Sequence, residues 1–279
     1  MLGAVLFAED SPIDILGGWG GGGRSAVDYR RIAVPNVGYR EMHREPDYRG
    51  VQLADEETVT GRLQRSLRWR PITTAVERCY GIRDNLLLAM VMQESYGNPI
   101  QPNMKMDGGL GLMHMQPVVA NGFGLKVYGD RHVLANRRYG RGLAEMLRSH
   151  NWDMRGIIPH DDRIHPVRNI DCGGRIVMTG HQKHDRWDLA AEYYFAPGYV
   201  GKGLGWGYWN RVNRFLSASG NPASRQLAER DFNQRNAGFS VTYPDGKRRD
   251  ASFERYLGDF EMICENYGLL DYRTTKRLP

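Results

Sequence analysis

Hydrophobic residues recur at helical spacing through the middle of the chain. From Pro71 onward, Ile72, Ala75, Val76 and Cys79 fall on one helix face, because positions three and four apart lie side by side. Three further segments have helical character: 86–94, which is apolar on most sides, 134–147 and 187–194. The pattern therefore predicts a mainly α fold class for the centre of the chain.

The two ends of the chain follow a different pattern. Residues 1–70 contain the run GGWGGGG (17–23), and glycine has no side chain to contribute to a core. The chain becomes polar after Asn221; residues 239–243, followed by Pro-Asp-Gly, predict a strand and a turn, and residues 253–267 predict a terminal helix. Three parts are therefore predicted: an irregular, glycine-rich extension (1–70), a helical domain (71–217) and a C-terminal extension (218–279).

Composition adds a preference for anionic partners. The chain has 279 residues, and its 34 glycines exceed the usual share of about 7%. The chain has 38 Lys and Arg against 32 Asp and Glu, which gives a formal charge of +6. This charge favours binding to an anionic partner such as nucleic acid, a membrane face or a bacterial wall polymer. No apolar run approaches the roughly 18 residues of a membrane span, so we expect none.

The cysteines and the N-terminal residues bear on metal binding, disulfide formation and secretion. Cys79, Cys172 and Cys264 are too far apart for a zinc motif, and an odd count is no disulfide framework, so we expect buried thiols. Residues 1–8 are apolar, but no Lys or Arg precedes them and acidic residues follow at once. That is not the pattern of a secretory signal.

A glutamate at the end of an apolar helix is the most informative feature. In NLLLAMVMQESYGN (85–98), Leu87, Val91 and Glu94 share one face, and Gly97 predicts the end of the helix. Apolar surroundings and the negative end of the helix dipole both disfavour ionisation, which predicts a raised pKa. Glu94 is then a candidate general acid for cleaving a glycosidic bond. The alternative is a glutamate that ends a helix and points at solvent.

Two later segments carry residues suited to a sugar ligand. In MDGGLGLMHMQP (106–117), three glycines permit close approach of the backbone to a ligand, and methionines can line an irregular surface. Tyr193 and Tyr194 close an apolar helix just before Pro197, where they can stack on a sugar or donate hydrogen bonds. Tyrosines of the core are the alternative interpretation.

In this order and spacing, the segments resemble the soluble lytic transglycosylase family, lysozyme-like enzymes that cut peptidoglycan. Four stretches between residues 71 and 216 carry the resemblance: Glu94-Ser95, Gly108 to Met113 with Pro117, Arg168 to Gly173, and Ala191 to Gly198. The resemblance implies an α+β lysozyme-like domain with a glycan-binding groove and Glu94 as the catalytic residue. It also implies substrate-binding positions: Ser95, Gly111, Met113, His114, Gln116, Tyr193 and Tyr194.

The chain also departs from the family pattern. His114 stands where the family has glutamine, and Gln116 follows two residues later, so either could meet the substrate. Tyr194, Phe195 and Ala196 replace smaller residues. The stretch 129–159 is longer than the family minimum, and we expect it to cover one end of the groove.

The implied reaction cuts the bond between N-acetylmuramic acid and N-acetylglucosamine. Glu94 would protonate the leaving oxygen and then, as a carboxylate, take the proton of the muramoyl C6 hydroxyl, which closes a 1,6-anhydro ring. Hydrolysis by a goose-type lysozyme is the alternative, and it would use a second carboxylate to direct water. Asp107 is the candidate for that role.

Two rival functions rest on other residues. A metal site could be built from histidines and aspartates that are close in sequence: His181, His184 and Asp185, or His160, Asp161 and Asp162. Nucleic-acid binding could use arginines interleaved with aromatic residues: Arg62, Arg65, Arg68, Trp69 and Arg70, or Arg137, Arg138, Tyr139 and Arg141. Solvated surface residues explain both sets more simply, so we expect no metal, no cofactor and no nucleic acid.

A third rival is an assembly protein that keeps a lysozyme-like fold without activity. The flanks 1–70 and 218–279 are unnecessary for the chemistry and suit docking onto partner proteins. A wall-cutting domain without a signal peptide is expected in a phage particle or a secretion machine. We therefore expect action at the bacterial cell wall, with peptidoglycan and virion, tail or secretion-machine proteins as partners.

Overall fold

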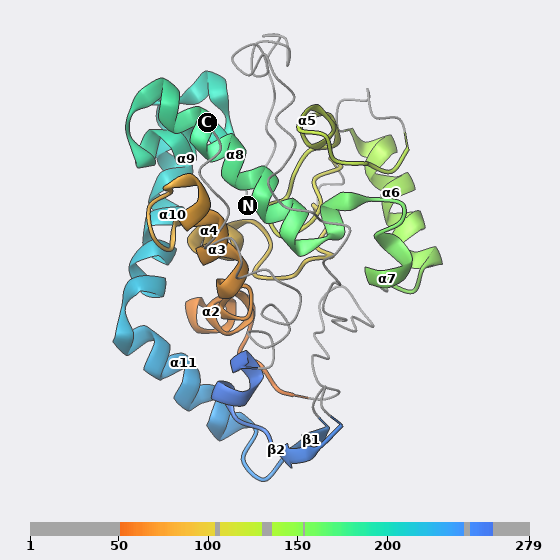
Figure 1. The fold of residues 1–279 in the computed structure, drawn as a ribbon, viewed down its shortest axis with the longest axis vertical. Coiled ribbons are helices and arrows are strands. Elements are labelled where there is room, and N and C mark those ends of the chain that lie inside the picture. Colours follow the sequence, from red (N-terminus) through yellow and green to blue (C-terminus); the bar gives the residue numbers. More distant parts are fainter. Residues whose placement is uncertain (1–50, 104–106, 130–135, 153, 243–245, 259–279) are drawn as a thin grey trace.

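The computed structural model describes residues 51–103, 107–129, 136–152, 154–242 and 246–258. These residues are mainly helical and contain one sheet, of two short strands (Figure 1). The predicted mainly α class is therefore confirmed.

The helix that carries Glu94 lies at the centre of the fold. In α4 (Leu86–Glu94), residues 86–92 are all fully buried, as expected of a helix that is apolar on most sides. Four helices pack against it: α2 (Val59–Leu67), α3 (Arg70–Tyr80), α8 (Pro166–His184) and α10 (Gly203–Gly220). The helix predicted at 86–94 is confirmed, with Glu94 in its last turn.

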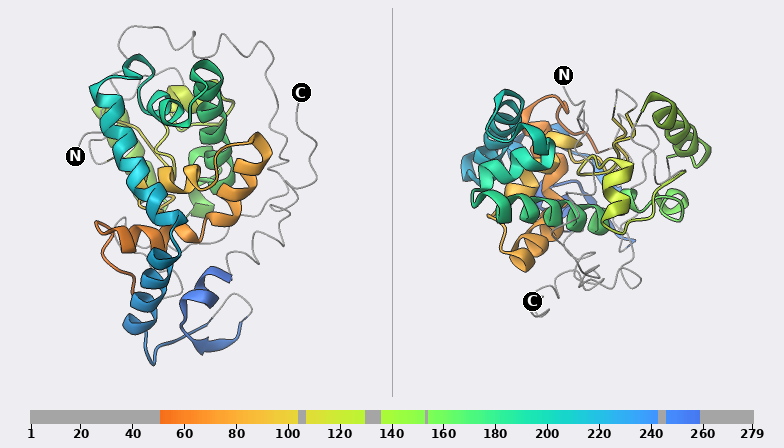
Figure 2. Two further views of the ribbon diagram at one scale, coloured as in Figure 1. Left: turned by 90° about the vertical axis from the view of Figure 1, so that its left-hand side faces the viewer. Right: turned by 90° about the horizontal axis from the view of Figure 1, so that it is seen from above.

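The other elements surround this centre. They are α5 (Pro117–Gly122), α6 (Arg137–Ser149), α7 (Met154–Ile157), α9 (Trp187–Phe195), α11 (Pro222–Arg235), two short 3₁₀ turns (Asp162–Ile164 and Pro197–Tyr199), β1 (Ser240–Thr242) and β2 (Arg248–Asp250). The strands are antiparallel, with Val241 opposite Arg249. Figures 1 and 2 place α5, α6 and α7 on one side of the molecule, while α11 runs down to the hairpin at its lower end.

The flanks are more closely joined to the helical body than the sequence indicated. Helix α2 lies inside the stretch predicted as an irregular extension, and Leu63 and Trp69 are buried in the common core. At the other end, residues 253–258 are helical, and the Tyr256 hydroxyl accepts a hydrogen bond from Arg68 at 3.2 Å. The glycine run and the rest of the predicted terminal helix lie outside the described residues.

A buried carboxylate holds the N-terminal end of α4. The two oxygens of Glu77, on α3, accept hydrogen bonds from the backbone amides of Asn85 (3.0 Å) and Leu87 (2.8 Å). These amides belong to the end of a helix, where N–H groups have no partner within the helix. Burial raises the pKa of Glu77 to about 7, although the amides oppose that rise. A carboxyl group thus lies at each end of α4: Glu77 of α3 at its N-terminal end and Glu94 at its C-terminal end.

The glycine-containing loop after α4 is fixed by one asparagine of α8. The side-chain oxygen of Asn169 accepts from the Met113 amide at 2.7 Å, and its amide group donates to the Arg163 carbonyl at 2.8 Å. Gly111 packs directly on this side chain, with a φ of 86°. The glycine is therefore required by contact within the protein.

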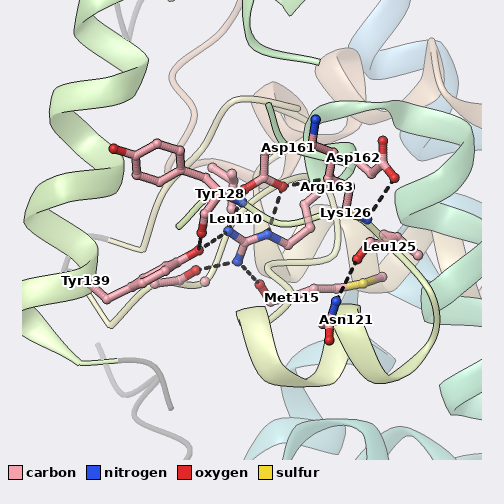
Figure 3. A network of polar contacts seen from close by, with 12 residues as sticks. Leu110, Met115, Asn121, Leu125, Lys126, Tyr128, Tyr139, Asp161, Asp162 and Arg163 are labelled. Atoms are coloured by element: carbon pink, nitrogen blue, oxygen red, sulfur yellow. Dashed lines mark hydrogen bonds and ion pairs between the residues drawn. The ribbon is translucent and has the colours of Figure 1, made fainter. Parts of the chain in front are cut away.

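The same loop is tied to α6 through a fully buried arginine (Figure 3). Arg163 pairs with Asp161 at 2.7 Å and donates to the carbonyls of Gly108 (2.7 Å) and Met115 (3.0 Å). It also donates to the Tyr139 hydroxyl of α6 at 2.9 Å. Every N–H group of this guanidinium thus has an acceptor, and its hydrogen bonds connect the loop to α6.

We expect Gly111→Ala to destabilise the fold more than Gly124→Ala. Both glycines have positive φ (86° and 88°), where alanine costs about 1–2 kcal/mol. A Cβ at Gly111 would lie 2.2 Å from the Arg163 carbonyl oxygen and 2.3 Å from Asn169, whereas nothing lies within 4 Å at Gly124. The overlap adds about 1–3 kcal/mol. Urea unfolding measures both losses, and equal losses would contradict this packing.

Candidate active site

Glu94 ends α4 with its carboxyl group largely removed from water. Only 16% of the side chain is exposed. Burial raises the pKa of Glu94 from 4.5 to about 7, the negative charge of Asp107 adds to the rise, and Tyr208 and Arg211 oppose it. The carboxyl is thus protonated in part at neutral pH, the state that a general acid requires.

Helix α10 supplies two groups that the sequence analysis did not identify, Tyr208 and Arg211. The Tyr208 side chain is buried, and its ring stacks on Phe195 with centroids 4.7 Å apart. The Tyr208 hydroxyl is near enough to the Glu94 carboxyl to lower the pKa of Glu94. It makes no hydrogen bond of regular geometry with any described residue. The spacing of three between Tyr208 and Arg211 is a helical signal that could have placed them on one face.

His114 is the loop residue that meets Glu94. Its Nδ1 lies 3.8 Å from a Glu94 carboxyl oxygen, and 16% of its side chain is exposed. Burial lowers the pKa of His114 to about 4, so the imidazole is neutral at pH 7 and this contact is not an ion pair. Its backbone is left-handed, with a φ of 45°, a conformation that costs energy in a residue other than glycine.

Gln116, the other candidate for this position, lies at the start of α5. Its side-chain oxygen is buried and has no hydrogen-bond partner among the described residues. The described contacts therefore bring His114, and not Gln116, to Glu94.

Asp107 is near enough to influence Glu94 but is held by its own loop. One of its oxygens accepts from the Asn103 side chain at 2.7 Å, and the other accepts from the Gly109 amide at 3.0 Å. These bonds keep the carboxylate in place at the start of the glycine segment.

The two tyrosines of α9 point to different neighbours. The Tyr194 hydroxyl donates to the Met113 carbonyl, and the charge of Glu94 helps to raise the pKa of Tyr194. Tyr193 instead turns to α8, where its hydroxyl accepts from Lys183 at 3.1 Å and its ring lies 6.0 Å from that of His184. Tyr194 thus belongs to the group around Glu94, and Tyr193 does not.

Three other predicted substrate positions make contacts inside the protein. The Ser95 hydroxyl is buried and donates to the Val91 carbonyl at 3.2 Å. The Met113 side chain is buried against Gly173 of α8, and Gly111 packs on Asn169. These contacts give the residues a role in shaping the loop and the end of α4.

Three residues of the rival metal sites make other contacts. The His181 ring stacks on Trp187 at 3.8 Å, and Asp161 and Asp162 pair with Arg163 and Arg168. Within the described ranges, no group of three or more His, Cys, Asp or Glu side chains is arranged to hold a metal ion.

The first arginine cluster proposed for nucleic acid is largely internal. Arg65, Arg68 and Trp69 are buried, and the Arg62 guanidinium lies 3.8 Å from the ring centre of Tyr96.

The part of the chain that the structure describes has no helix long and apolar enough to cross a membrane.

The cysteines differ from the expectation at one position. Cys172 is a buried free thiol, as predicted, whereas Cys79 is only half-buried because it lies near the end of α3. Cys264 lies outside the described residues.

We expect Glu94→Gln to stabilise the protein at high pH. In the unfolded chain the carboxyl ionises near pH 4.5, but the folded protein holds the proton until about pH 7, so ionisation penalises folding as pH rises between these values. The shift corresponds to about 3 kcal/mol, present in full above pH 7 and vanishing toward the lower value. Unfolding of variant and wild type at pH 8 and pH 4.5 measures it.

The exposed Glu145 of α6 offers a matched control, because Glu145→Gln removes a carboxylate that is already in water. A stabilisation by Glu94→Gln that is equal at both pH values would contradict a raised pKa.

The group around Glu94 is drawn from four parts of the chain. It combines the end of α4 with Tyr208 and Arg211 of α10, His114 and Asp107 of the loop, and Tyr194 of α9. No family model matches this chain, and no match is found among curated proteins or among solved structures. The functional argument therefore depends on these residues and on the sequence motifs described above.

Proposed function

We propose that the protein is a peptidoglycan lytic transglycosylase with a lysozyme-like domain, acting at the bacterial cell wall. One observation carries the proposal: Glu94 is a largely buried carboxyl group whose pKa is raised to about 7, with part of its side chain still exposed. Such a group can both give and take a proton at neutral pH. The ordered resemblance of four sequence segments supplies the substrate class.

The reaction uses one carboxyl group twice. Protonated Glu94 donates to the glycosidic oxygen as the bond from the muramoyl C1 breaks, which releases N-acetylglucosamine with its hydroxyl restored. The resulting carboxylate accepts the proton of the C6 hydroxyl, whose oxygen bonds to C1 and closes the 1,6-anhydro ring. Glu94 ends protonated, so the cycle needs neither water nor a second acid.

The neighbours of Glu94 suit both stages. Tyr208 and Arg211 favour the carboxylate, which forms as the leaving oxygen is protonated. Burial favours the protonated acid at the start, and neutral His114 adds no charge that would draw the proton away. The balance between these effects keeps the pKa of Glu94 near neutrality.

We expect Glu94→Gln to abolish lysis of purified peptidoglycan. The amide has nearly the same shape but cannot donate an acidic proton, and general acid–base catalysis contributes about 10²–10⁴-fold to a rate. Zymography and turbidity assays measure the loss. Thermal unfolding of the same variant checks that the fold is intact. Substantial activity in a folded Glu94→Gln protein would refute the assignment.

Goose-type hydrolysis is the second candidate, because the negative charge of Asp107 acts on Glu94. An inverting hydrolase needs a second carboxylate to direct water. Hydrogen bonds from Asn103 and Gly109 hold Asp107 to its own loop, and no described contact joins it directly to Glu94, so we favour cyclisation.

Mass spectrometry of the digest separates these outcomes. We expect muropeptides ending in 1,6-anhydro-N-acetylmuramic acid, and we expect Asp107→Asn to leave that product unchanged. Reducing ends in the wild-type digest, lost in Asp107→Asn, would establish the hydrolase instead.

A further inference from the structure

One helix holds a large part of the positive charge of the chain. The sequence of α6 contains four arginines and a single acidic residue, Glu145, giving a formal charge of +3 against +6 for the whole chain. The four arginines are all exposed: Arg137, Arg138, Arg141 and Arg148.

The packing of α6 fixes the direction of this charge. Leu143, Ala144, Met146 and Leu147 are buried, so the arginines occupy the opposite, outer side. None of the four makes an ion pair with a described residue, whereas Arg163 and Arg175 are paired with aspartates. We call these four exposed residues the arginine face of α6.

The arginine face is connected to the loop beside Glu94. Tyr139, in the first turn of α6, accepts a hydrogen bond from Arg163, which also donates to the carbonyls of Gly108 and Met115 (Figure 3). His114 lies between these two carbonyls in sequence and contacts Glu94 at 3.8 Å. A ligand held on α6 would thus lie on a helix that is joined to the loop of the site through Tyr139 and Arg163.

We propose that the arginine face of α6 binds the carboxylates of the peptide stems that flank the glycan strand. The inference rests on the proposed function, since those stems accompany the scissile bond in peptidoglycan. Guanidinium groups bind carboxylates through paired hydrogen bonds. Nucleic acid is disfavoured because Tyr139, the aromatic residue among these arginines, is half-buried with its hydroxyl bound to Arg163 and Tyr128, which leaves less of its ring for a base to stack on.

The test compares two triple variants with the same change in charge. One carries Arg137→Gln, Arg141→Gln and Arg148→Gln on the arginine face. The control carries Arg214→Gln, Arg225→Gln and Arg230→Gln, three exposed arginines of α10 and α11. Each is assayed on intact peptidoglycan and on the same glycan strands after an amidase has removed the stems.

We expect the α6 variant to raise KM on intact peptidoglycan about tenfold, with kcat unchanged, as three exposed charge contacts would give. On strands without stems it should match the wild type, and the control should match it on both substrates. An equal loss on both substrates, or no loss on either, would overturn the proposal. So would salt-sensitive DNA binding that disappears in the α6 variant while KM does not change.

Binding in a Glu94→Gln background separates this proposal from the proposed function. Sedimentation with intact and stem-free peptidoglycan measures the arginine face without any catalysis. If the wild type cleaves neither substrate, the proposed function fails, while weaker binding of the α6 variant to intact peptidoglycan alone still supports stem recognition. Equal binding to both materials would contradict stem recognition even in an active enzyme.

Discussion

The burial of α4 is the constraint on which the rest of the structure depends. Because residues 86–92 are apolar on every side, neighbouring helices must enclose them, and the carboxyl at the end of that helix is drawn out of water with them. The raised pKa of Glu94 is the electrostatic result of this hydrophobic packing. The stability of the core and the raised pKa of the carboxyl therefore have one cause, and the ionised state of Glu94 is less stable in the folded protein as a result.

Around that centre, buried polar side chains give the loop its shape. Asn169 and Arg163 each bind backbone groups of residues 108–115, a segment whose own backbone hydrogen bonds form a turn and a single bridge between Leu110 and Met115. A buried guanidinium whose donors are all engaged avoids the large cost of an unpaired charge. This fixed loop brings His114 to Glu94 in a left-handed backbone conformation that an unsupported chain would rarely keep.

The sequence predicted the elements whose pattern was local. The helix at 86–94, the last-turn position of Glu94 and the helix beginning at Trp187 follow from apolar spacing. Helix α2 was missed because its arginines indicate a solvated segment, whereas Arg65 is buried with its guanidinium donating to the Ala54 and Gly61 carbonyls.

The choice between Tyr193 and Tyr194 was likewise beyond a local pattern. Adjacent helical positions point about 100° apart, and the packing of α9 over Gly180 decides which of them turns to α8. Tyr208 and Arg211 depend in the same way on how α10 packs against α4. Contacts between distant segments, rather than propensity, complete the candidate site.

The turn that follows Glu94 is linked through Arg68 to a residue much later in the sequence. The Gly97 carbonyl accepts from both Trp69 and Arg68, and Arg68 also binds Tyr256. During synthesis, Tyr256 leaves the ribosome long after Glu94, so the hydrogen bond that Tyr256 accepts from Arg68 forms only after all the residues between them have been made. A growing chain would thus carry the Glu94 carboxyl beside a turn whose partner Arg68 still lacks one of its own contacts.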